Sequence, residues 1–134
     1  MDAAQALADL TEISSQIQAA VLLDEKGAVT ASTFSGGERA ARVARAAQEL
    51  LAAADRVRGG SGKAWTQLEA ATLAGSVFVV RDGSRTIAAT TTPEPTVGLV
   101  FYDLKSCLRS VAGEKPRSPA AKRKVLQKEP DAAP

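Results

Sequence analysis

The sequence offers few side chains that could carry out chemistry. It contains no histidine and one cysteine, Cys107. Metal sites built from histidine or cysteine, histidine-based triads and acid–base catalysis by imidazole are therefore excluded. Cys107 falls beside the apolar stripe of a predicted helix, and we interpret it as a small buried residue. The carboxylates form no arrangement typical of a catalytic site. We therefore expect no catalytic residue, no metal, no cofactor and no enzymatic activity.

A glycine-rich segment, residues 59–63, is similar to a phosphate-binding loop but departs from that motif at three points. The first glycine of the motif would fall on Val57, and Ala64 stands where serine or threonine is required. The segment also follows a predicted helix and precedes a predicted strand, which is the reverse of the motif's order. We interpret it as the end of a helix followed by a link.

Basic residues are concentrated at the C-terminus. Residues 114–134 hold six basic and three acidic residues, whereas residues 1–113 have a net charge of −1. This end of the chain is rich in Pro, Ala and Lys and has no apolar periodicity, which predicts a disordered tail over 113–134 after one domain over 1–112. The basic cluster over 122–124 has two open interpretations: a solvated tail, or a contact with nucleic acid or another anionic surface.

Apolar periodicity predicts the elements that must position any site. In chain order they are a helix over 3–14, strands over 17–23 and 28–33, a long helix from the Ser35–Glu38 capping box to about residue 57, strands over 64–71, 75–81 and 85–91, and a helix over 97–111. The fold class is α/β. We expect a five-stranded, mostly antiparallel sheet with the long helix on one face and the two terminal helices on the other.

The predicted long helix carries an apolar stripe on one side and a charged stripe on the opposite side. Its apolar stripe follows helical spacing, and four further alanines widen the non-polar surface. That width indicates either a second packing partner or simply a high alanine content. The opposite stripe is charged. Its members include Glu38, Arg42, Arg45 and Glu49.

The third predicted strand has a mixed character. Trp65, Gln67 and Glu69 share one face and Leu68 points the other way. The strand is either half-buried or an edge available for pairing.

The element order and several stretches resemble the Roadblock/dynein light chain family, in particular its small prokaryotic members. The resemblance covers about residues 3–112. The matching stretches are residues 19–29, where an apolar run, Asp24 and a turn glycine precede a second apolar run, the Ala-rich helix after Gly36-Gly37, Leu68-Glu69, residues 75–83 and residues 98–100.

The resemblance implies a homodimer, or a heterodimer with a related Roadblock protein. Its edge strands would pair across a two-fold axis while the long helices lie side by side. The residues implied at the dimer interface are Ala40, Ala44, Ala47 and Leu51 on the helix and Trp65, Gln67 and Glu69 on the strand.

The resemblance also implies a partner, because prokaryotic relatives act on small Ras-like GTPases. Our hypothesis is a non-enzymatic dimeric regulator that binds such a GTPase through Glu38, Arg42, Arg45 and Glu49, although the same stripe could be only a solvated helix face. The alternative is a dimerising scaffold whose basic tail tethers it to another protein, nucleic acid or a membrane surface. With no signal-like N-terminus and no long apolar run, we expect a cytoplasmic protein.

Overall fold

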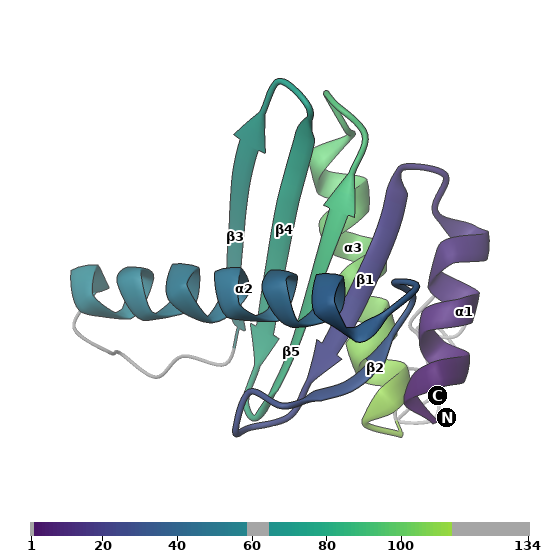
Figure 1. Cartoon of the computed structure of the whole chain (residues 1–134), viewed down its shortest axis with the longest axis horizontal. Coiled ribbons are helices and arrows are strands. Elements are labelled where there is room, and N and C mark those ends of the chain that lie inside the picture. The colour runs from purple at the N-terminus through teal and green to yellow at the C-terminus, as the bar shows by residue number, and fades with distance from the viewer. Residues whose placement is uncertain (1, 59–64, 114–134) are drawn as a thin grey trace, which may run out of the picture.

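The computed structural model describes residues 2–58 and 65–113, and Figure 1 shows the arrangement of its elements. The elements are α1 (Ala3–Ile13), β1 (Ile17–Leu23), β2 (Val29–Ser32), α2 (Gly37–Arg58), β3 (Trp65–Thr72), β4 (Gly75–Asp82), β5 (Arg85–Thr91) and α3 (Val97–Val111). The order of the elements is the predicted one, and β1, β5 and α3 have the predicted bounds. The glycine-rich segment over 59–63 and residues 114–134 of the predicted tail lie outside the described residues.

The five strands form one sheet in the order β2-β1-β5-β4-β3. All pairings within it are antiparallel. β1 therefore pairs with β5 rather than only with its neighbour in sequence, and β3 lies at one edge. The register of β3 against β4 pairs Gln67 with Val80 and Glu69 with Phe78.

Helices cover both faces of the sheet, as the sequence predicts. On one face α1 and α3 pack over a core centred on Phe78, Ile87 and Leu104. On the other face α2 packs over Val21, Val79 and Ala88. The strands are apolar on both sides because each side meets a helix.

Local sequence signals explain how α1 begins and how the chain turns between β1 and β2. The Asp2 carboxylate accepts a hydrogen bond from the Gln5 N–H at 2.8 Å, which caps the start of α1. In the β1–β2 turn, the Asp24 carboxylate accepts from the N–H groups of Lys26 and Ala28. Gly27 completes this turn at φ +84°, a left-handed conformation that favours glycine.

Candidate protein-interaction site

The charged stripe of α2 faces away from the sheet. Glu38, Arg42, Arg45 and Glu49 are all exposed, as expected for residues that bind a partner and equally for a solvated face. Arg42 lies 3.7 Å from Glu38, with both side chains mostly in solvent. An exposed pair of this kind contributes little to stability, so both side chains are available to a partner.

The alanines assigned to a dimer interface are instead part of the protein's own core. Ala40, Ala44, Ala47 and Leu51 are 3%, 5%, 0% and 7% exposed, and they pack against the sheet. The prediction for these four residues is wrong. The small alanines let α2 approach its own sheet closely, which leaves no surface there for a second chain.

A second, only partly covered apolar flank of α2 lies one residue further round the helix. Val43 and Leu50 are half-buried, Ala46 is exposed and Val57 is 83% exposed. These residues recur at spacings of three, four and seven, so they form one flank of the helix. Val43 and Leu50 pack against the edge of the core on the α2 face, whereas Val57 lies in solvent. The extra width of the apolar surface was the signal that a second flank existed.

α2 is longer than the sheet is wide. Its 22 residues span about 33 Å, whereas five strands at their usual spacing span about 19 Å. Because α2 crosses the strands at a steep angle, its C-terminal part extends past β3 (Figure 1). The exposed Val57 belongs to this extending part.

β3 is an edge strand, so one of the two open interpretations of this strand is confirmed. β4 pairs with one side of β3, and no described strand pairs with the other. Gln67 and Glu69 are exposed, and their register places them on the α1/α3 face. Leu68 points to the α2 face and packs against that core. The structure does not describe the Trp65 side chain.

A basic and apolar hollow lies beside the first half of α2. Its volume is about 370 Å³. Phe34 and Val43 form part of the wall, Val77 and Thr90 come from the sheet, and Arg39 and Arg42 supply positive charge. The Arg39 guanidinium lies 5.8 Å from the centre of the Phe34 ring. The hollow can therefore take an apolar side chain next to a negative group.

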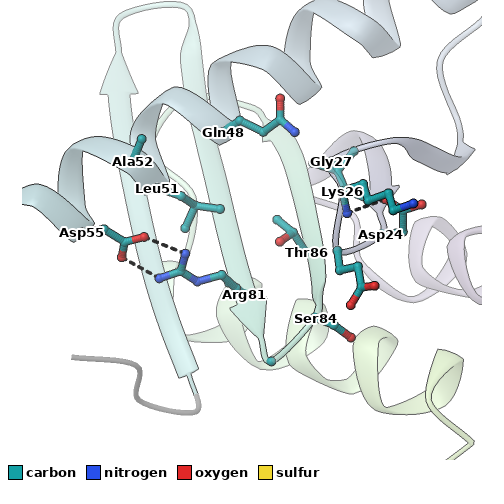
Figure 2. Close-up of a pocket in the computed structure, with 13 residues that line it drawn as sticks. Asp24, Lys26, Gly27, Gln48, Leu51, Ala52, Asp55, Arg81, Ser84 and Thr86 are labelled. Carbon is teal, nitrogen blue, oxygen red and sulfur yellow. Dashed lines mark hydrogen bonds and ion pairs between the residues drawn. The ribbon is translucent and has the colours of Figure 1, made fainter. Parts of the chain in front are cut away.

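A second hollow, of about 580 Å³, lies on the opposite flank of α2, between that helix and the β1–β2 and β4–β5 turns (Figure 2). An ion pair lines it: Arg81 Nη1 and Nη2 donate to the Asp55 carboxylate at 3.0 and 2.8 Å. The hydrogen bond lowers the pKa of Asp55 and raises that of Arg81, and partial burial opposes both shifts. The pair ties α2 to β4, so we assign it a structural role.

Cys107 is buried between α1 and α3, as predicted. Its Sγ lies 3.6 Å from the Ala6 carbonyl oxygen. Burial, with a smaller contribution from Asp9, raises the pKa of the thiol to about 12. A thiol of this kind is a poor nucleophile at neutral pH.

Over residues 2–58 and 65–113, no group of three or more Cys, Asp or Glu side chains is arranged to hold a metal ion. Within the same ranges, no helix has both the length and the hydropathy required to cross a bilayer.

Comparison with known proteins places this geometry in a family. Residues 4–92 match the family model of the Roadblock/LC7 domain. A Roadblock/LC7 domain from Streptomyces avermitilis has the same fold at 21% identity and a TM-score of 0.72, covering 84% of this chain and 97% of its own. Myxococcus xanthus MglB aligns at 14% identity and a TM-score of 0.60, covering 83% of this chain and 92% of its own. No curated protein sequence matches the chain.

Proposed function

The chain belongs to the Roadblock/LC7 family, and from that membership we propose that it is a non-enzymatic, dimeric regulator of a small Ras-like GTPase in the cytoplasm. The observation that supports this proposal best is the helix α2. One face of it is buried on the sheet, one flank is apolar and only partly covered, and its outer face carries exposed charges.

The dimer in this proposal forms through the free edge of β3. An exposed edge strand presents unpaired backbone groups and readily pairs with another strand. Antiparallel pairing of two β3 strands joins the two sheets across a two-fold axis perpendicular to them. Both α2 helices then lie on the same face of the joined sheet.

The length of α2 supports this arrangement. The part of α2 that extends past β3 would lie over the sheet of the second copy, which removes its apolar residues from water. α2 crosses β3 nearer the beginning of the strand than its middle (Figure 1), and Val77 pairs with Ala70 near the strand's end. Rotation about the middle of β3 therefore brings the partner's helix to the flank that carries Val43 and Leu50.

The hollow beside Phe34 fits the end of the partner's helix. In this arrangement Val57 of one copy reaches the hollow formed by Phe34, Val43 and Val77 of the other. Arg39, whose guanidinium lies beside Phe34 at the rim, would meet the C-terminal end of the partner's α2, where the helix dipole is negative. The proposed interface thus uses the flank that carries Val43, Leu50 and Val57. It does not use the buried residues Ala40, Ala44, Ala47 and Leu51.

Dimerisation would create the surface for the GTPase. Side-by-side α2 helices present two copies of Glu38, Arg42, Arg45 and Glu49 on one platform. A regulator of this type needs no histidine or metal, because it can position the switch regions of the GTPase and leave the chemistry to that protein's own residues. The charges on the platform would set the orientation and rate of association.

The proposal is tested by reversing the charges of the platform. The double substitution Arg42→Glu and Arg45→Glu should abolish binding of the GTPase and leave the dimer intact. Unchanged binding would contradict the assignment of this face. The rival function, a scaffold that acts through its basic tail, predicts instead that deletion of residues 114–134 removes all partner binding.

A further inference from the structure

A partly apolar hollow lies where β3 turns into β4, next to the start of α3. Its volume is about 250 Å³. Leu73 in the turn is 100% exposed, and Val97 at the start of α3 is also exposed. Pro93 and Pro95 complete an apolar wall. Exposed aliphatic side chains that adjoin a hollow are typical of a surface that another segment covers.

The charge of this hollow is negative. Glu69 on β3 and Glu94 before α3 contribute carboxylates, and none of the described residues that line it is basic. Glu69 lies on the α1/α3 face of the sheet and is exposed there. A segment that binds here should combine aliphatic side chains with positive charge.

The chain itself contains such a segment. Residues 122–128 read Lys-Arg-Lys-Val-Leu-Gln-Lys, with four basic residues, no acidic residue and two adjacent aliphatic residues, Val125 and Leu126. Among the basic residues after α3, this cluster is the one with aliphatic neighbours. Its charge and its apolar content both match the hollow.

The segment is close enough to return to the hollow. α3 begins beside the hollow and its 15 residues span about 22 Å. The 14 residues from Val111 to Val125 can span up to about 45 Å when extended. A tethered segment has an effective concentration on the order of millimolar, so weak contacts suffice for binding.

From this match of shape, charge and reach we propose that residues 122–128 bind in the hollow of their own chain. Val125 and Leu126 contact Leu73 and Val97, and the basic side chains pair with Glu69 and Glu94. Occupancy would keep the basic cluster from other anionic partners until one competes for it. This inference is independent of the dimer and of the GTPase.

The test places a nitroxide next to the two aliphatic residues in the full-length chain. Gln127→Cys supplies the attachment site, and the wild-type chain treated with the same reagent controls for labelling of the buried Cys107. The proposal predicts loss of amide NMR signal at Leu73, Val97 and Glu69, with the signal restored by reduction of the nitroxide. The charge reversals Glu69→Lys and Glu94→Lys should also restore it.

A matched variant and a mixing experiment make the result decisive. Glu12→Lys and Glu25→Lys reverse two exposed charges elsewhere and should leave the signal loss unchanged. No loss near the hollow, or a loss that survives the reversals at positions 69 and 94, would overturn the proposal. The mixing experiment combines nitroxide-labelled chains with separate isotope-labelled chains. A loss of signal that appears only in this mixture would also overturn the proposal, because a second copy would then be the occupant.

Discussion

Arg81 on β4 holds Asp55 on α2 through two parallel hydrogen bonds, although the two residues are 26 positions apart in the sequence. Arg81 also donates to the Thr66 hydroxyl on β3 at 3.2 Å. One guanidinium thus joins the helix to the two outermost strands on this side of the sheet. It fixes the C-terminal part of α2 to this side of the sheet.

This ion pair predicts a change of stability at acidic pH. The pKa of Asp55 is lowered in the folded state, so its contribution to stability is present above the carboxyl's unfolded pKa and is lost as pH falls through the folded value. Asp55→Asn should lower the melting temperature slightly at pH 7 and much less at acidic pH, where the wild-type pair is already lost. The measurement is thermal unfolding of both proteins between pH 2 and 7, and an equal difference across that range would contradict the prediction.

Substitution of Val57 should change the assembly of the protein without changing its folding. Because its side chain is 83% exposed, Val57→Asp should leave the stability of one subunit nearly unchanged. At the proposed interface it would bury a carboxylate and weaken the dimer at least about tenfold. Sedimentation equilibrium measures this, with Ile13→Asp, another exposed aliphatic residue, as the matched control. Equal dimer affinity in the two variants would exclude Val57 from the interface.

Substitution of Ala47 should have the opposite effect and change the folding stability of one subunit. It is 0% exposed and packs against the sheet, so Ala47→Leu should overpack the core and reduce the free energy of unfolding by about 1–3 kcal/mol. Urea unfolding at a concentration where the protein is monomeric measures the loss. If stability were unchanged and only the dimer were weakened, Ala47 would belong to the interface after all.

We expect the thiol of Cys107 to be unreactive in the native protein. With its pKa raised to about 12, almost no thiolate is present at pH 8, and the side chain is buried. A disulfide reagent such as DTNB should therefore modify the native protein slowly and react with one thiol per chain at once in denaturant. Fast and complete reaction of the native protein would show that α1 and α3 separate readily.

Sequence patterns predict this fold well because most of the signals are local. β5 and α3 have their predicted bounds, since a turn signal precedes the strand and a regular apolar stripe runs along the helix. The relation between the layers also follows from pattern, because strands apolar on both faces require helices on both sides. The side chain of Asp2 caps α1, and aspartate is strongly preferred at such a position.

The candidate site was harder to predict because it depends on which stripe of α2 meets the sheet. Alanines occur on several sides of this helix, so composition does not distinguish Ala44 in the core from Ala46 on the free flank. The Asp55–Arg81 pair and the hollow beside Phe34 join residues that are far apart in the chain. No local pattern encodes such contacts, and only the packed structure brings them together.

Binding of a Ras-like GTPase to the native chain decides whether this protein is a GTPase regulator. The protein is used as bait in its native cell lysate, with GTP and with GDP analogues, and captured proteins are identified by mass spectrometry. We expect a Ras-like GTPase to be enriched in one nucleotide state, and Arg42→Glu with Arg45→Glu to remove it while Ile13→Asp does not. If no GTPase is captured, or if capture depends on residues 114–134 and not on the two arginines, the regulator assignment is wrong.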